Sequence, residues 1–282
     1  YMQNKNIFND INVNGYSIAK NVIPKKDVNE IKEKVIKVQK NNNDLAERDL
    51  NDTRKKGHKI GVSGVGLLKQ VVNHTQCFVQ YLDHELVLGV AKMFFGDYVR
   101  ISCTDCVINY PGNERGYWHA DWPYNGTNST HIKTPYPDVM MHLSTIWMLT
   151  DFNPDSGSTY FIPKSFLENN NPATNNIPNL NNMDSHPEQK QVYGEAGSVF
   201  LYDSRLWHAV ATNNSDTPRV ALIIRYAPWW LNLTPTMRGT PDNKRMVVDT
   251  GGKNYDSIPL NRNVFETLPD SIKDLYMHWV ID

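Results

Sequence analysis

The feature that most constrains this fold is a series of short β-rich runs between residues 97 and 232. Each run is rich in β-branched and aromatic residues, and Gly, Pro, Asn and Asp separate one run from the next. The runs are DYVRISCTDCVINY, MHLSTIWMLTDF, STYFIP, GSVFLYD, LWHAVAT and RVALIIRYAPWW. Short strands punctuated in this way indicate an antiparallel barrel or sandwich, so we expect a mainly β fold.

The N-terminal part has a helical pattern instead. Residues 25–40 carry apolar side chains at spacings of three and four among lysines and glutamates, namely Val28, Ile31, Val35 and Val38. This spacing predicts an amphipathic helix with one buried stripe. Residues 76–95 predict a second helical region that ends at Gly96. We therefore expect N-terminal helices that support the β-rich part.

No internal repeat is found, so we expect a single domain over residues 2–282, with residues 233–282 as a C-terminal extension. Residues 41–66 are polar and then Gly-rich, and residues 164–193 contain the low-complexity run NNNPATNNIPNLNN. Loops longer than about 12 to 15 residues are uncommon unless they act as lids or binding loops. Both segments are predicted to be loops that could cover a site.

Charge and hydropathy argue against several classes of partner. The net charge is −1 and the pI is about 6.8, so no strong field attracts a polyanion such as nucleic acid. No apolar run approaches the roughly 20 residues that cross a bilayer, and no apolar signal core is seen at the N-terminus. We expect a cytoplasmic protein without a membrane or nucleic-acid partner, and the sequence leaves its oligomeric state open.

Cys103 and Cys106 form a C-x-x-C pair, which invites a redox or zinc interpretation. No second C-x-x-C and no paired histidines accompany it. Cysteine side chains buried in a strand are therefore the favoured interpretation.

The run YWHADWP places His119 and Asp121 two residues apart, so on a strand both side chains point to the same face. Such a pair is weak evidence by itself. A third ligand is offered by His208, which lies between a strand that ends at YDSR and a strand that begins at Arg219. Two histidines and one carboxylate on one face of a metal are the arrangement of non-haem Fe(II) oxygenases.

Three runs together carry a resemblance to a known family: YWHADWPYN, HLSTIWMLTDFNPDSGSTYFIPKSF and GSVFLYDSRLWHAVATNNSDTPRVALIIRYAPWW. With the helical start at GYSIAKNVIPKKDVNEIKEKV, they are similar to the phytanoyl-CoA dioxygenase family of Fe(II)- and 2-oxoglutarate-dependent oxygenases, over roughly residues 14–232. The resemblance implies a double-stranded β-helix, that is, a cupin-like jelly-roll barrel.

The resemblance also implies roles for particular residues. His119, Asp121 and His208 match the iron ligands, and Arg219 matches the arginine that pairs with the distal carboxylate of 2-oxoglutarate. A guanidinium suits this role because it is permanently charged and binds carboxylates in a bidentate way. Trp147 matches a tryptophan that lines the cosubstrate pocket, and Asn109 is a candidate for holding the other end of the cosubstrate.

The implied reaction uses O2 and releases succinate and CO2 while a C–H bond of a small-molecule metabolite is oxidised. Hydroxylation, desaturation and ring closure all remain open as outcomes. The carboxylate of Asp121 disfavours a halogenase, because halogenating relatives have a small residue there. Candidate substrate contacts are Arg225, Tyr117 and Trp122, although Arg225 could equally be a paired strand arginine and tryptophans are often core residues.

Two other classes of function stay open at this point. A non-catalytic ligand-binding module could use the same barrel, and loss of Arg219 or of one metal ligand would have favoured it; all four positions are intact. A zinc hydrolase could use the same three ligands, but Arg219 would then have no role.

Overall fold

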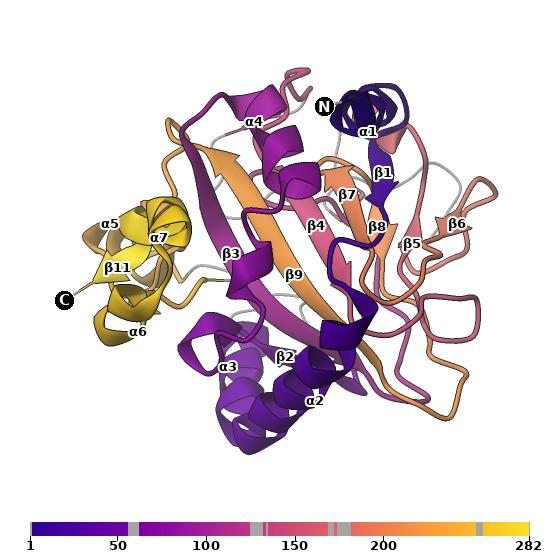
Figure 1. Cartoon of the computed structure of the whole chain (residues 1–282), viewed down its shortest axis with the longest axis horizontal. Coiled ribbons are helices and arrows are strands. Elements are labelled where there is room, and N and C mark those ends of the chain that lie inside the picture. The colour runs from indigo at the N-terminus through magenta and orange to yellow at the C-terminus, as the bar shows by residue number, and fades with distance from the viewer. Residues whose placement is uncertain are drawn as a thin grey trace.

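The computed structural model describes residues 2–55, 62–124, 132–133, 135–168, 172–173, 182–251 and 256–281. Two facing β-sheets form the core, and helices cover the outer face of the larger sheet (Figure 1). The helices are α1 (Met2–Asn14), α2 (Lys25–Asn41), α3 (Asn43–Lys55), α4 (Val90–Phe95), α5 (Pro241–Asn243), α6 (Arg262–Thr267) and α7 (Asp270–Tyr276). The strands are β1 (Tyr16–Ala19), β2 (Val65–Leu68), β3 (Val99–Asn109), β4 (Leu143–Met148), β5 (Tyr160–Phe161), β6 (Lys190–Gln191), β7 (Val199–Asp203), β8 (His208–Ala209), β9 (Arg219–Pro228), β10 (Leu260–Asn261) and β11 (Val280–Ile281).

Short 3-10 and π turns complete the chain. They are η1 (Val71–Asn73), η2 (Val79–Tyr81), η3 (Glu85–Gly89), η4 (Ser165–Leu167), η5 (Thr234–Thr236), η6 (Lys244–Val248) and η7 (Met277–Trp279). The predicted helical region 76–95 therefore contains η2, η3 and α4, and its α-helical part begins only at Val90.

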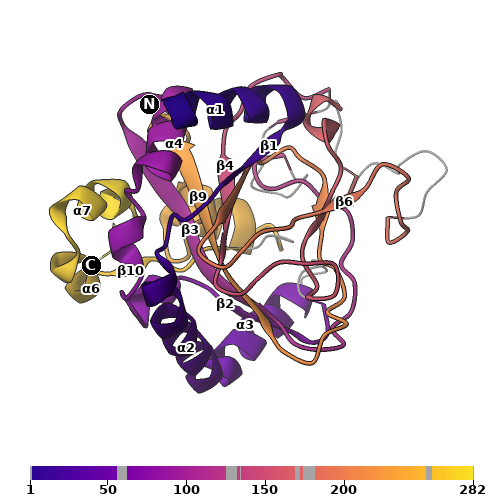
Figure 2. The same ribbon diagram turned by 45° about the vertical axis from the view of Figure 1, so that its right-hand side comes forward.

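The large sheet has six strands in the order β1-β7-β4-β9-β3-β2, and all neighbouring pairs are antiparallel. The small sheet has the order β6-β5-β8, and a bridge between His119 and His208 adds one more segment to its β8 edge. The predicted jelly-roll barrel with N-terminal helices is confirmed by this arrangement of two antiparallel sheets. Figure 2 shows α1 beside α4 near one end of the large sheet, with α2 and α3 near the other end.

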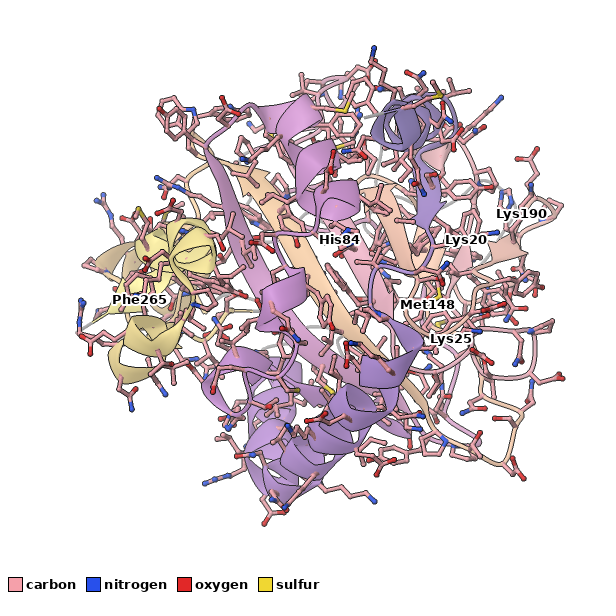
Figure 3. The ribbon with its side chains drawn as sticks, in the orientation of Figure 1. Lys20, Lys25, His84, Met148, Lys190 and Phe265 are labelled. Atoms are coloured by element: carbon pink, nitrogen blue, oxygen red, sulfur yellow. The ribbon has the colours of Figure 1, made fainter. Side chains whose placement is uncertain are left out.

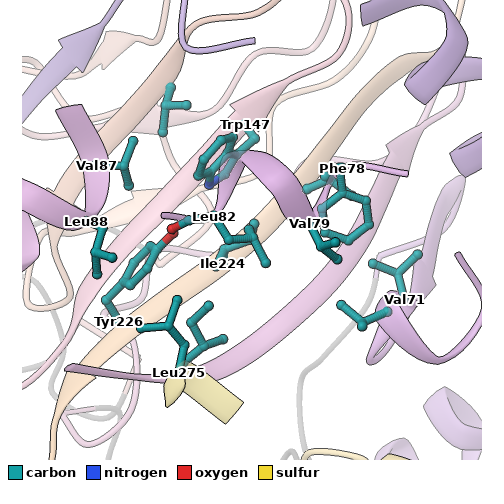
Figure 4. Packing of buried hydrophobic residues seen from close by; sticks show 14 of the residues in the cluster. Val71, Phe78, Val79, Leu82, Val87, Leu88, Trp147, Ile224, Tyr226 and Leu275 are labelled. Atoms are coloured by element: carbon teal, nitrogen blue, oxygen red, sulfur yellow. The ribbon is translucent and has the colours of Figure 1, made fainter. Parts of the chain in front are cut away.

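Alternation along β9 decides what lies on each face of the large sheet. The outward side chains pack against the helices in the main hydrophobic cluster, as Figure 4 shows for Ile224 and Tyr226 beside Leu82. The alternate residues, which include Arg219 and Arg225, point between the two sheets. The space between the sheets thus receives charged side chains from a strand that is otherwise apolar.

The prediction for residues 25–40 is confirmed by α2, in which Val28, Ile31 and Val35 are buried. The prediction that residues 41–66 form a loop is wrong for much of that range, because α3 covers Asn43–Lys55. No Gly or Pro interrupts α3, and Ala46 and Leu50, one helical turn apart, bury its inner side. Residues 56–61 lie outside the described chain.

The predicted loop 164–193 lies partly outside the described chain, at residues 169–171 and 174–181. Its described ends contain η4 and β6. A role for this segment as a lid remains a prediction.

The C-terminal extension packs against β3 and η1 (yellow in Figure 1). Tyr276 of α7 shares a hydrogen bond with Thr104 of β3, hydroxyl to hydroxyl. Asp256 forms a buried ion pair with Lys69 at 3.3 Å and a second ion pair with Arg238 at 2.7 Å. These contacts join the extension to β3 and to the residues that follow β2. Within the described residues, no helix is long and apolar enough to span a membrane.

The role of the extension in stability gives a first prediction. Trp279 is 1 % exposed and stacks on Tyr276, so Trp279→Ala is expected to lower the free energy of unfolding by about 3–5 kcal/mol. Urea unfolding measures this change. Trp230, which is 51 % exposed, is the matched control, and Trp230→Ala should change stability by no more than about 0.5 kcal/mol. Equal effects of the two substitutions would contradict the packing role.

Candidate metal centre

His119, Asp121 and His208 come together between the sheets. Each offers one ligand atom, and the three atoms lie within 4.8 Å of one another. The backbone fixes the two histidines side by side, because the His119 amide donates to the His208 carbonyl at 3.1 Å and the His208 amide donates back at 3.0 Å. The three predicted ligands thus form a compact metal-binding triad.

Both imidazole rings are oriented by backbone carbonyls. Nδ1 of His119 lies 3.1 Å from the Tyr117 carbonyl, and Nδ1 of His208 lies 2.8 Å from the Leu206 carbonyl. A neutral ring that donates from Nδ1 keeps the lone pair of Nε2 for a metal. Desolvation of the ring lowers the pKa of His119 to about 3, so this ligand is neutral at ordinary pH.

Asp121 has both carboxylate oxygens engaged. Oδ2 accepts hydrogen bonds from the Ser144 hydroxyl at 2.7 Å and the Tyr202 hydroxyl at 3.2 Å. Oδ1 accepts from the Arg225 guanidinium at 2.8 Å and lies 3.7 Å from Nε2 of His208. Burial by itself would raise the pKa of Asp121, but the nearby Arg225 cation and the Ser144 hydroxyl outweigh it and keep the pKa below its usual value. The carboxylate is therefore ionised, and it presents Oδ1 to the triad.

The hydrogen bond from Ser144 should matter for metal affinity. We expect Ser144→Ala to weaken metal binding about 10-fold, because the carboxylate of Asp121 loses its shortest hydrogen bond and is then held by two side chains, Tyr202 and Arg225, instead of three. Titration of the metal-free protein with Co(II), followed by its visible absorbance, measures the affinity. Ser102 is a buried serine that bonds His142 instead, so Ser102→Ala is the matched control. Wild-type affinity in Ser144→Ala would show that Ser144 does not position the ligand.

Arg219 is a buried cation at the start of β9. Arg219 is 3 % exposed, and the structure records no hydrogen bond or ion pair from its guanidinium to any described residue. The guanidinium lies over the Phe152 ring, 4.8 Å from the centroid. Burial lowers its pKa to about 9. Since a buried charge is costly without a partner, this guanidinium is suited to an anionic ligand that enters the barrel.

Asn109 lies directly opposite Arg219 in the register of β3 and β9. Its amide nitrogen is 3.4 Å from the carbonyls of Gly157 and Ala211, while its buried Oδ1 finds no partner among the described residues. Asn109 was predicted to hold the far end of the cosubstrate from Arg219. The structure instead places Asn109 next to Arg219, because the two residues are cross-strand partners of β3 and β9.

The prediction that Trp147 lines the cosubstrate pocket is wrong. On β4, Ser144 points toward Asp121, so alternation sends Trp147 to the opposite face. There its indole bonds the Thr145 hydroxyl at 2.8 Å and packs in the helix-covered cluster (Figure 4). Its place in the sequence motif does not bring it to the metal side.

The other predicted substrate contacts lie near the triad in different ways. Arg225 pairs with Asp121, which favours the strand-arginine interpretation over a separate substrate clamp. Tyr117 is half-buried, with its ring 5.2 Å from that of His119. Trp122 is buried, with its ring 5.3 Å from that of His142. Tyr117 and Trp122 therefore stay candidates for substrate contact.

Several residues near the site were not singled out from the sequence, notably Ser144, Tyr202 and His142. The available signal was a polar side chain inside an otherwise apolar strand, as in HLSTIW and VFLY. His142 is buried between the Trp122 carbonyl and the Ser102 hydroxyl, and desolvation lowers its pKa to about 4.

The cysteines and the turn before His208 agree with the simpler interpretations. In the described chain the three cysteines are free thiols, and Cys106 packs on the helix side whereas Cys103 lies cross-strand from Arg225 on the inner side. Two thiols on opposite faces of a strand cannot share a metal or a disulfide. In the turn before His208, Asp203 and Arg205 form a buried ion pair at 2.7 Å, which gives both residues a structural role.

A double-stranded β-helix with a His-x-Asp pair and a distal His between its sheets defines the class of cupin-like non-haem metal oxygenase folds. The family model described as Phytanoyl-CoA dioxygenase (PhyH) matches residues 11–221. This chain belongs to the phytanoyl-CoA dioxygenase family.

Individual relatives are distant. The chain is 28 % identical over 146 residues to dioxygenase af480 of Aspergillus fumigatus, a match that spans 51 % of this chain and 42 % of that protein. It is 21 % identical over 225 residues to an uncharacterized protein of Mycobacterium tuberculosis, and this match spans 75 % of this chain and 71 % of that protein. The first of these matches therefore reaches less than half of the relative's length.

Solved structures share the fold. HygX from Streptomyces hygroscopicus, solved with nickel and 2-oxoglutarate, aligns with a TM-score of 0.58 at 13 % identity and covers 81 % of this chain and 88 % of that chain. The epimerase SnoN, solved with Fe3+, alpha ketoglutarate and nogalamycin RO, aligns with a TM-score of 0.55 at 17 % identity. The alignment covers 80 % of this chain and 84 % of the SnoN chain. The carbocyclase SnoK from nogalamycin biosynthesis aligns with a TM-score of 0.54 at 18 % identity. The alignment covers 79 % of this chain and 83 % of the SnoK chain.

Proposed function

We propose that this protein is an Fe(II)- and 2-oxoglutarate-dependent dioxygenase that oxidises a C–H bond of a small-molecule metabolite. The observation that carries the proposal is the pairing of a metal triad with a buried, unpaired guanidinium among the described residues between the same two sheets. A dicarboxylate that binds the metal at one end needs a cation at its other end. Arg219 offers that cation.

The roles of the residues follow from their contacts. His119, Asp121 and His208 would hold the iron, and Arg219 with Asn109 would hold the distal carboxylate of 2-oxoglutarate. When bound, iron and 2-oxoglutarate supply the oxidising chemistry, in which O2 is consumed and succinate and CO2 are released. Ser144, Tyr202 and Arg225 orient Asp121.

The reaction outcome is proposed at the level of C–H oxidation, as hydroxylation, desaturation or ring closure. Neighbours of the same fold are described as an epimerase and a carbocyclase, so one barrel supports several outcomes. The retained Asp121 carboxylate argues against halogenation, because it takes the position that a halide would need.

The substrate is proposed to be a small molecule rather than a CoA thioester or a polymer. The net charge of −1 provides no strong field for a polyphosphate. HygX and SnoN were solved with hygromycin B and nogalamycin RO, respectively, which are small molecules. Tyr117, whose ring lies 5.2 Å from that of His119, and Trp122, which follows Asp121 in the chain, are the candidate contacts.

The test is an anaerobic titration of the metal-free protein with Fe(II) and then with 2-oxoglutarate. A metal-to-ligand charge-transfer band that needs both additions is the expected result, and succinate release then allows candidate substrates to be screened. Iron binding without the band would favour a ligand-binding module. Zinc-dependent hydrolysis without any 2-oxoglutarate requirement would favour a zinc hydrolase, which would leave the buried charge of Arg219 unexplained.

A further inference from the structure

The strand segment that carries His119 is held along both of its edges. On one edge it meets β8 and the residues after it, through the His119–His208 bridge and a bond from the Gly116 amide to the Val210 carbonyl at 2.9 Å. On the other edge the Trp118 amide donates to the Asn182 carbonyl at 3.0 Å. The side-chain amide of Asn182 donates back to the Trp118 carbonyl at 2.9 Å. Both backbone groups of Trp118 are therefore fixed from the side that is remote from His208.

Arg115 fastens the residues that follow Asn182 to the same strand segment. Its guanidinium lies over the rings of Tyr160 and Trp118, at 4.8 and 5.3 Å from their centroids. It donates to the Asp184 carbonyl at 2.9 Å and to the Ser185 hydroxyl at 3.3 Å. The Trp118 indole also donates to the Asp184 carbonyl, at 2.8 Å. Side chains of both segments thus join residues 182–185 to the strand segment that carries His119.

We propose that Asn182 and Arg115 are positioning residues for the metal centre, which they serve by holding the outer edge of the strand that carries His119. A metal site needs its ligands within about 0.5 Å of the productive geometry. On the inner edge, the strand segment is joined to β8 and its flanks by the His119–His208 bridge, by the Gly116 bond to Val210 and by a bond from the Asp121 amide to the Ser204 carbonyl at 2.7 Å. The outer edge supplies the second restraint. The inference rests on the proposed metal site and extends it to residues 182–185.

The experiment compares Asn182→Ala with the wild type in the metal-free full-length protein, titrated with Co(II). We expect about 10-fold weaker binding and a changed visible spectrum, because Nε2 of His119 moves relative to the other ligands. Hydrogen exchange should become faster in the peptide that contains residues 116–121 and stay unchanged in β3 and β9. The matched control is Asn4→Ala, since the side-chain amide of Asn4 also donates to a backbone carbonyl, that of Glu85, away from the triad.

Arg115→Lys provides a second, milder variant, because lysine keeps the charge and loses the fork that reaches both Asp184 and Ser185. It should shift affinity in the same direction, and it keeps the test decisive if Asn182→Ala does not fold. Co(II) affinity within 2-fold of wild type and an unchanged spectrum in a folded variant would overturn the inference. Failure of the wild type to bind Co(II) or Fe(II) would instead overturn the proposed function, so the two failures are distinguishable.

Discussion

Arg219→Met is expected to weaken 2-oxoglutarate binding about 100-fold, because the distal carboxylate would be buried without its cation. The charge-transfer band in the anaerobic Fe(II) protein, titrated with 2-oxoglutarate, measures the affinity. Iron affinity should stay the same, since Arg219 contacts none of the three ligands. Arg48 is an exposed arginine on α3, and Arg48→Met serves as the control. An unchanged 2-oxoglutarate affinity would mean that the cosubstrate is anchored elsewhere.

The same substitution should stabilise the metal-free fold. Burial lowers the pKa of Arg219 to about 9, so the folded state disfavours the cation that the unfolded chain tolerates in water. The guanidinium is charged in both states, so the folded state bears the cost of burying it. At pH 7 we expect Arg219→Met to raise the free energy of unfolding by roughly 1–3 kcal/mol.

Urea unfolding of the metal-free protein at pH 7 tests this sign. A destabilised variant at pH 7 would show that Arg219 already has a stabilising partner in the folded chain. Gain in stability with loss of cosubstrate binding would mark Arg219 as a residue kept for function.

His119→Ala is expected to abolish Fe(II) binding and, with it, the charge-transfer band and turnover. The triad has only three protein ligands, and removal of one leaves a carboxylate and a single imidazole. The fold should persist, because His119 is neutral and its backbone bridge to His208 does not depend on the side chain. Calorimetry with Co(II) or Fe(II) and far-UV circular dichroism measure the two effects.

The control for this variant is His84→Ala. His84 lies on the helix-covered side, where its ring accepts a hydrogen bond from the Leu86 amide at the start of η3 (Figure 3). It should bind metal like the wild type. Full turnover in His119→Ala would remove His119 from the ligand set, whereas recovery of metal binding on addition of free imidazole would support its assignment.

The sequence by itself determined those features that depend on neighbouring residues. The spacing of His119 and Asp121 puts both on one face of any strand. The stripe of Val28, Ile31 and Val35 specifies α2, because the three residues meet only on a helix. The jelly-roll fold and the role of His208 as a metal ligand were predicted from three runs of sequence that together resemble one family.

Only the tertiary structure decided which face of each strand meets the metal. Every residue of β4 is buried, so its hydrophobicity does not alternate, and nothing local distinguishes Ser144 on the metal side from Trp147 on the helix side. The bonds from Ser144 and Tyr202 to Asp121 join residues 23 and 81 positions apart. Likewise, Asn109 lies next to Arg219 because β3 and β9 pair in a register that makes these two residues cross-strand partners. Such choices are set by how two sheets pack and pair, because a strand buried on both faces carries no signal of its orientation.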